Sequence, residues 1–242
     1  MISLEDYYRY SPRPAVQAMI RRQMLGDGGT YEEFIEQLYA DIDESIYELQ
    51  ATRELRQNDS EDRISLDILV GLKRHGYNAT HDSKTGGHVD LSVRLGPHSW
   101  IGEAKKDGNF HEGFLQLTSR YVQASGNYAH DQGGLLFYMV KTADALRKLN
   151  TWRAQLTSDD HFCTDCRTNR LAFYSTHKLE GSGTDFKVRS MFISLYHRPT
   201  DKSARITAEK KVAQTAPAKA AKKTSPAKSQ TSTTSVGRSA KP

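Results

Sequence analysis

The amino-acid composition changes near residue 200, and this change limits which part of the chain can fold. Residues 201–242 consist mainly of Ala, Lys, Thr, Ser and Pro and contain few large apolar side chains. Such a segment cannot bury enough apolar surface to offset the conformational entropy that ordering removes. We therefore expect residues 201–242 to be a disordered tail and the fold to be built from residues 1–200.

Formal charge is divided between the same two parts of the chain. The tail has ten Lys or Arg residues against two acidic residues, a charge of +8, whereas residues 1–200 have 24 basic and 27 acidic residues, a charge of −3. A flexible polycation binds phosphate backbones without sequence preference. The Lys/Ala/Pro run from Ala216 to Lys228 resembles the tails of linker-histone-like proteins. The tail thus predicts contact with nucleic acid, and a solubilising role is the alternative.

The sequence also excludes several classes of protein. The longest strongly apolar run, Leu135–Val140, is too short to span a bilayer. The first residues lack the pattern of a signal peptide, and two cysteines do not make the disulfide framework of a small secreted protein. We expect a soluble cytoplasmic protein with no membrane partner, associated with the nucleoid if the source is bacterial.

Apolar periodicity predicts helices in the N-terminal part of the chain. Apolar residues over 31–57 have helical spacing, and Thr30 with Glu33 forms a capping-box pattern at the start. Shorter helices are expected within Pro14–Leu25 and from Ser60 to Gly76. We assign residues 1–57 to a helical extension, whose long helix could form a homodimer interface, and residues 58–200 to the main domain.

Strand patterns begin after Gly76. The expected order is a three-strand meander, a helix, a buried strand, a helix and a C-terminal hairpin. These elements are expected over Tyr77–His81, His88–Leu95, Ser99–Lys105, Phe114–Ser125, Gly134–Lys141, Ala143–Leu156, Arg170–His177 and Phe186–His197. The order predicts an α/β or α+β domain with a mixed central sheet.

One hairpin in this order brings charged side chains together. If its turn is centred between Gly96 and Pro97, Asp90 lies opposite Glu103 and His88 opposite Lys105, and opposed residues share one face of the sheet. Two carboxylates this close repel unless a cation joins them, and Mg²⁺ prefers oxygen ligands. A metal held there would polarise a phosphoryl oxygen and lower the pKa of bound water. Lys105 would orient that water or stabilise the transition state.

An amphipathic hairpin with surface ion pairs is the alternative interpretation, because Glu-x-Lys is common in strands. The surrounding residues favour a metal site. Apolar residues precede the triplet, in Trp100-Ile101-Gly102, and Ala104 separates its two charges. Charged groups at a partly buried strand end favour a functional site over a surface ion pair, because burying charge is costly.

At these residues the sequence resembles the PD-(D/E)xK nuclease superfamily, which includes restriction endonucleases and Holliday-junction resolvases. Asp90 matches the aspartate of the motif and Glu103-Ala104-Lys105 the (D/E)xK triplet, while Val89 stands where the proline would be. The resemblance covers about residues 58–141. It implies a restriction-endonuclease-like αβββαβ core within residues 58–200, with the N-terminal helices and the C-terminal hairpin added to it. It also implies a Mg²⁺-dependent deoxyribonuclease, Mn²⁺ being able to substitute, that leaves a 5′-phosphate.

The resemblance implies two more site residues. An acidic residue from the first core helix would be a further metal ligand, and Glu61 is our choice, although periodicity leaves Asp62 open. Gln116 is expected near the metal or the DNA, and a solvated helix face explains it equally well. Apolar neighbours on that helix, Phe114, Leu117 and Tyr121, are expected to pack on the sheet. Lesser candidates for contact with phosphate are His88, Lys84, Arg94, Lys106 and Arg120.

The two cysteines, Cys163 and Cys166, have the Cys-x-x-Cys spacing of some zinc sites. A structural Zn²⁺ site needs four ligands, which His161 with His177 or His197 would complete. No second cysteine pair is present, so we favour a reduced pair in a long loop over zinc.

The function predicted is hydrolysis of phosphodiester bonds, most consistent with a metal-dependent endonuclease acting on DNA. A non-catalytic nucleic-acid-binding protein is the main alternative, in which the basic tail binds DNA and the folded body recruits a partner. An RNA-processing enzyme on the same scaffold is a third possibility, because metal chemistry at phosphate does not distinguish DNA from RNA.

Overall fold

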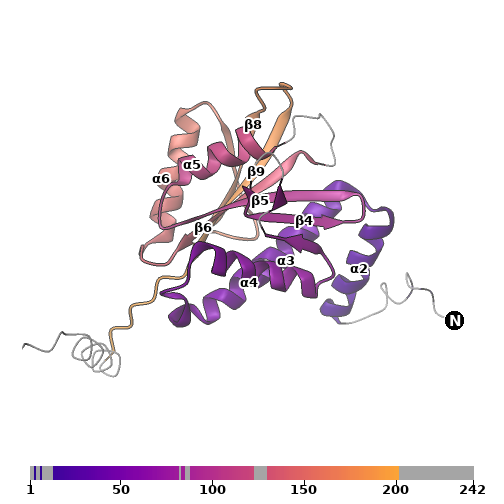
Figure 1. Ribbon diagram of the computed structural model, residues 1–242, viewed down its shortest axis with the longest axis horizontal. Helices are drawn as coiled ribbons and strands as arrows, with labels where there is room; N and C mark the ends of the chain where they lie inside the picture. The colour runs from indigo at the N-terminus through magenta and orange to yellow at the C-terminus, as the bar shows by residue number, and fades with distance from the viewer. Residues whose placement is uncertain are drawn as a thin grey trace, which may run out of the picture. The chain divides into compact units, whose positions relative to one another are not determined.

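The computed structural model describes Ser3, Asp6 and residues 13–81, 83–84, 88–122 and 130–201 (Figure 1). One compact unit extends to His197, and a second unit begins at Arg198. The predicted disordered tail lies outside the described residues from residue 202 onward. Within the described part of the chain, no helix is long and apolar enough to cross a membrane.

Within the described residues from 13 to 76 the α-helices are α2 (Pro14–Gly28), α3 (Tyr31–Ala51) and α4 (Glu61–Arg74). The capping box predicted for α3 is confirmed, since the Thr30 hydroxyl accepts the Glu33 N–H and the Glu33 carboxylate accepts the Thr30 N–H. Helix α3 ends at Ala51, and a 3-10 turn, η1 (Arg53–Arg56), replaces the last turn expected up to residue 57. Ser60 caps α4 by accepting the Arg63 N–H at 3.1 Å.

The remaining described residues form a seven-stranded mixed sheet, a two-stranded ribbon and further helices. The order in the large sheet is β1-β4-β5-β6-β9-β8-β7, with β5–β6 and β6–β9 parallel and the other pairs antiparallel. Its strands are β1 (Asn78–Thr80), β4 (Leu91–Leu95), β5 (His98–Lys106), β6 (Gln132–Met139), β7 (Phe162–Asp165), β8 (Ala172–Lys178) and β9 (Asp185–Ser194). The ribbon is β2 (Ser83–Lys84) with β3 (His88–Val89), and the helices are α5 (Phe110–Leu115), the π-helix η2 (Gln116–Tyr121) and α6 (Ala145–Ser158).

The described residues therefore form a mixed α/β fold, with five α-helices and a mixed sheet, as the order of elements predicted. Strands β8 and β9 make the expected C-terminal hairpin. The helix predicted over Phe114–Ser125 begins earlier, at Phe110, and changes to π-helical hydrogen bonding at Gln116. Residues 123–129 lie outside the described part.

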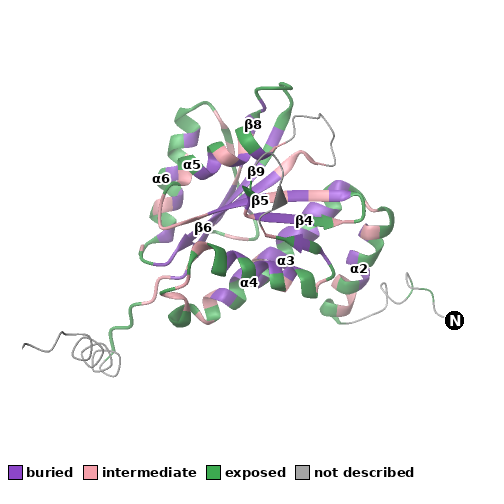
Figure 2. Cartoon of the chain, viewed as in Figure 1, coloured by how far each residue is buried: buried purple, intermediate pink, exposed green. Residues whose placement is uncertain are grey.

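Helices cover both faces of the sheet, and the strands between them are buried (Figures 1 and 2). One hydrophobic cluster joins α3 and α4 to the sheet, and another joins α5 and α6 to its opposite face. On α3, Phe34, Leu38 and Ile42 are fully buried in the first cluster. The apolar stripe of α3 therefore packs inside the chain, and a homodimer would need another surface.

The register predicted for the hairpin that turns between Gly96 and Pro97 is confirmed over β4 and β5. Leu91 pairs with Gly102 and Leu95 with His98, so the turn is Gly96-Pro97. Gly96 has φ +55°, a conformation that glycine adopts at little cost in two-residue hairpin turns.

The strand expected over His88–Leu95 is interrupted at Asp90, and this corrects the predicted pairing of His88 with Lys105. The backbone N–H of Ala104 donates to the Asp90 carboxylate at 2.8 Å. Since the side chain takes this donor, the regular ladder stops at Leu91. His88 pairs instead with Lys84, in the β2–β3 ribbon.

Candidate active site

The carboxyl-terminal half of β5 brings together most of the predicted site residues. Glu103 and Lys105 alternate with Ala104, and Ala104 packs in the cluster under α3 and α4. The two charged side chains therefore point to the opposite face, where α5 lies. Asp90 reaches the same strand from the start of β4, and Glu61 from the first turn of α4.

Glu103 is the most buried of these carboxylates, with 2% of its surface exposed. Its Oε1 accepts a hydrogen bond from Lys105 Nζ at 2.5 Å, whereas its buried Oε2 has no hydrogen-bond partner among the described residues. Burial raises the pKa of Glu103 to about 8, the Asp90 carboxylate acts in the same direction, and Lys105 opposes both. A buried carboxylate oxygen without a donor is costly, and such an oxygen is available to a cation.

Lys105 lies between two carboxylates. Its Nζ is 2.5 Å from Glu103 Oε1 and 4.0 Å from Glu61 Oε1. Burial alone would lower the pKa of Lys105, but the Glu103 and Glu61 carboxylates outweigh it and the pKa is raised. Lys105 is therefore a cation at neutral pH, suited to donating hydrogen bonds and stabilising negative charge.

The structure distinguishes Glu61 from Asp62. Glu61 Oε2 accepts the backbone N–H of Lys106 at 2.5 Å, whereas the Asp62 side chain is 70% exposed and lies 3.7 Å from His81 Nε2. Burial, together with the charge of Asp90, raises the pKa of Glu61 against the opposing effect of Lys105. Glu61 is thus the helix carboxylate that faces the site.

Asp90 holds its position through the Ala104 amide, and its charge influences both Glu103 and Glu61. The three carboxylates do not, however, place three ligand atoms within 4.8 Å of one another, a condition that only one group of described residues meets. Glu61 is instead held beside Lys105 and Lys106.

Helix α5 packs directly over the β5 side chains, because it has a glycine at the contact. A Cβ added to Gly113 would lie 2.9 Å from Lys105 Cγ and 3.7 Å from Glu103 Cγ. No other residue type allows the helix this close without displacing Lys105. Gly113 was not among the predicted site residues, although an isolated glycine within a helical pattern is a known sign of close packing.

The π-helix η2 follows α5 and carries Gln116 and Tyr121. Single π-helical turns within helices occur frequently at functional sites. Gln116 is half-buried, and its Oε1 has no hydrogen-bond partner among the described residues. Phe114, Leu117 and Tyr121 are buried, which confirms that this side packs on the sheet. Burial raises the pKa of Tyr121, and so do the charges of Glu103 and Asp90, so this tyrosine is also a neighbour of the site.

Asp107 fixes the end of β5. It has φ +57°, and its Oδ1 accepts the backbone N–H groups of Val140, Lys141 and Thr142 at 2.9, 2.8 and 3.2 Å. These bonds join the end of β5 to the end of β6, directly after Lys105 and Lys106.

The weaker candidates lie around this centre. Arg94 and Arg120 are exposed, as is His88. Lys106 Nζ donates to the backbone oxygen of Asp59. The side chain of Lys84 lies outside the described residues.

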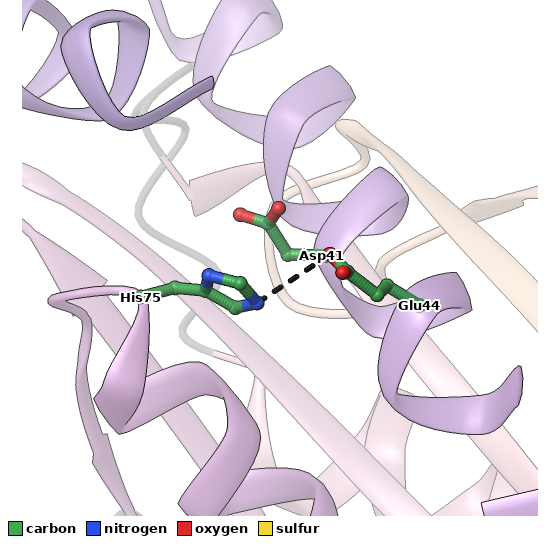
Figure 3. Close-up of side chains that lie close together, drawn as sticks. All are labelled: Asp41, Glu44 and His75. Atoms are coloured by element: carbon green, nitrogen blue, oxygen red, sulfur yellow. Dashed lines mark ion pairs between the residues drawn. The ribbon is translucent and has the colours of Figure 1, made fainter. Parts of the chain in front are cut away.

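A second group of ionisable side chains lies on the opposite side of the sheet. Asp41 and Glu44 come from α3 and His75 from the end of α4, and the His75–Glu44 ion pair spans 3.5 Å (Figure 3). The oxygens of Asp41 already accept four hydrogen bonds, two from Arg22 and one each from Gln37 and Tyr77. A metal ion would have to displace the Arg22 guanidinium, so this group is a structural ion-pair network.

The two cysteines lie apart from both groups. Cys163 is on β7, not in the expected loop, and packs against the cluster under α5 and α6, whereas Cys166 belongs to the cluster under α3 and α4. Cys166 Sγ contacts Arg189 Nη2 at 3.3 Å. Of the candidate histidine ligands, His161 and His177 pack edge to face, with ring centroids 4.3 Å apart. Because the two thiols contact opposite layers of the molecule, they do not converge on one zinc ion.

No protein-family model, curated protein or solved structure matches this chain. Function is therefore inferred from the chemistry of the site.

Proposed function

We propose that this protein is a metal-dependent nuclease of the PD-(D/E)xK type that hydrolyses phosphodiester bonds of DNA. The observation that carries the proposal is Glu103. It is a buried carboxylate, with one oxygen lacking a donor, beside a second carboxylate and a lysine. Such an arrangement is costly in a fold without a cationic ligand and is typical of a site that binds one.

The order of elements supports the same proposal. Helix α4, strands β1, β4 and β5, helix α5 and strand β6 follow one another in the αβββαβ order that the resemblance implies. The four strands lie side by side in the sheet in the order β1-β4-β5-β6. Of their three pairings, only β5–β6 is parallel. The β2–β3 ribbon, the strands β7 to β9 and helices α2 and α3 are additions to this core.

The donor set fits a hard divalent cation such as Mg²⁺ or Mn²⁺. Asp90 and Glu103 would hold it through carboxylate oxygens, of which Glu103 Oε2 has no donor among the described residues. When bound, the ion would polarise a phosphoryl oxygen and lower the pKa of a coordinated water. Its charge would also favour the ionised form of Glu103, against the effect of burial.

The chain's own residues then have distinct roles. Lys105, protonated at neutral pH, would donate to the attacking water or to the phosphoryl oxygen on which charge develops. Glu61, 4.0 Å from Lys105 Nζ, would keep the ammonium in place, and Asp107 would hold the end of β5. Gln116 would orient the substrate or the water from η2.

The test is a cleavage assay on linear, circular and single-stranded DNA with Mg²⁺, Mn²⁺ or EDTA. We expect cleavage that needs the metal and that falls about 100-fold or more in Asp90→Asn and Lys105→Met. Matched controls are Asp62→Asn, whose side chain is exposed on the same helix turn as Glu61, and Lys73→Met, exposed near the end of α4. Both controls should keep the wild-type rate.

Full activity in Asp90→Asn or Lys105→Met would overturn this assignment. Absence of cleavage on every DNA substrate, with DNA binding intact, would favour the non-catalytic alternative in which the basic tail binds DNA. Cleavage of RNA only would keep the site and change the substrate.

A further inference from the structure

A cavity of about 330 Å³ lies beside the carboxylates on the same face of the sheet. Its lining includes Ser92, Arg94, Ser99, Ile101, Tyr121 and His130. Ser92 pairs with Ile101 across β4 and β5, and Glu103 follows Ile101 by two residues on the same face. Two residues of strand span about 7 Å, so the cavity begins roughly one nucleotide's length from the proposed site of cleavage.

Tyr121 connects the cavity to the carboxylates. It lines the cavity, and it lies near enough to Glu103 and Asp90 for their charges to act on its hydroxyl. Tyr121 is the last residue of the π-helix η2 and is buried, so its ring packs on the face of the sheet that holds both regions.

The lining combines flat apolar surface with fixed polar groups. Tyr121, Ile101 and Val122 supply the apolar part. Ser99 Oγ and His130 Nδ1 share a hydrogen bond of 2.5 Å, which fixes the orientation of the imidazole in the wall. Small pockets with apolar walls and a few oriented polar groups suit a planar ring that has polar edges, and a nucleobase has this chemistry. Exposed Arg94 adds a cation for a neighbouring phosphate.

We propose that this cavity binds one unpaired nucleobase of the strand being cut, so that the enzyme prefers single-stranded or locally unpaired nucleic acid. The proposal rests on the proposed nuclease function for the identity of the strand. A base within a duplex is stacked and paired, and it must leave the stack before it can enter a protein pocket.

Binding in EDTA tests the cavity separately from catalysis. The full-length protein is titrated into two fluorescein-labelled probes of equal length, a thymidine oligonucleotide and an abasic oligonucleotide. The probes carry the same phosphate charge, so the basic tail contributes equally to both. We expect the wild-type protein to bind the thymidine probe about 10-fold more tightly, the effect of one well-packed base.

Three substitutions and one control then show whether the preference for the thymidine probe comes from the cavity. Ser99→Phe and Ser92→Leu fill the cavity from two strands and should each abolish the preference for thymidine, with unchanged thermal melting by circular dichroism. Arg94→Gln should lower the affinity for both probes by the same factor. The control is Arg74→Gln, which replaces an exposed arginine of α4 on the other side of the sheet. It should change neither affinity.

Equal affinity of the wild-type protein for the two probes would overturn the proposal, as would a retained preference in both folded cavity-filling variants. Faster cleavage of a fully paired duplex than of a single strand would also overturn it. A base preference that depends on Ser99 and Ser92, in a protein without metal-dependent cleavage, would support the cavity and refute the nuclease function.

Discussion

Two carboxylates in this molecule are equally buried and differ in their hydrogen bonds. Asp41 on α3 and Glu103 on β5 are each 2% exposed. Asp41 accepts four hydrogen bonds, including two from the Arg22 guanidinium, whereas Glu103 accepts one from Lys105 and leaves Oε2 without a donor among the described residues. Burial raises the pKa of Glu103 to about 8.

The comparison separates a carboxylate whose hydrogen bonds are complete from the carboxylate that we propose binds a cation. A carboxylate whose oxygens are all occupied has no coordination left for a ligand, and its removal should affect folding. A buried carboxylate that lacks donors destabilises the fold but can bind a cation, and its removal should affect activity.

Glu103→Gln should lower metal-dependent cleavage about 1,000-fold, because the amide binds a divalent cation poorly and removes one of two prospective ligands. Initial rates on single-stranded DNA in Mg²⁺ measure the loss, and Glu112→Gln, exposed on α5, is the control. The melting temperature of Glu103→Gln should not fall. A stable variant that keeps the wild-type rate would contradict the assignment of Glu103.

Asp41→Asn should lower the free energy of unfolding by about 3 kcal/mol, because it leaves the buried Arg22 guanidinium without its counter-charge. Urea denaturation followed by circular dichroism measures the change. The rate of cleavage per folded molecule should stay near that of the wild type. A large loss of activity with little loss of stability would reverse the roles given to the two carboxylates.

Gly113→Ala should slow cleavage about 10- to 100-fold, because the added Cβ would displace Lys105, and small displacements of a catalytic group have effects of this size. Gly108→Ala is the matched control, since a Cβ added there meets no atom within 4 Å. Equal rates for the two variants would show that the close packing of α5 on Lys105 has no catalytic importance.

The stability of the wild-type protein relative to Glu103→Gln should fall as pH rises from about 5 to 8 in EDTA. The folded state keeps a proton on Glu103 up to about pH 8, whereas the unfolded state releases it near the ordinary pKa of 4.5. The folded state therefore binds more protons in this window, and its stability falls by at most about 1.4 kcal/mol per pH unit. Urea denaturation of both proteins at four pH values measures the difference, and a constant difference would show that burial does not raise this pKa.

Glu44→Gln should change the free energy of unfolding by less than about 0.5 kcal/mol, because the Glu44 side chain is exposed and solvent screens its pair with the half-buried His75. Addition of Mg²⁺ or Zn²⁺ should change the melting temperatures of the wild type and of Glu44→Gln by the same amount. If Glu44→Gln removed a metal-induced rise in melting temperature, the cluster of Asp41, Glu44 and His75 would be a metal site after all.

Local chemistry made several features predictable from the sequence. The turn Gly96-Pro97 and the alternation of β4 and β5 predicted the register that the structure has, because hairpin pairing depends on residues close in the chain. The caps at Thr30 and Ser60 were predictable for the same reason. The interruption at Asp90 was not, since it depends on a side chain replacing a backbone acceptor across the hairpin.

The amino-acid sequence alone was enough to predict the order of helices and strands, the hairpin register that brings Asp90 toward Glu103, and the position of Lys105 on the same strand as Glu103. Tertiary packing was needed to show that Glu61 and not Asp62 faces the site, that Gly113 admits α5 and that Tyr121 lines a cavity near the carboxylates. Glu61 meets the Lys106 amide across 45 residues of chain. Contacts of this kind depend on how layers pack, and neither periodicity nor spacing within one element contains that information.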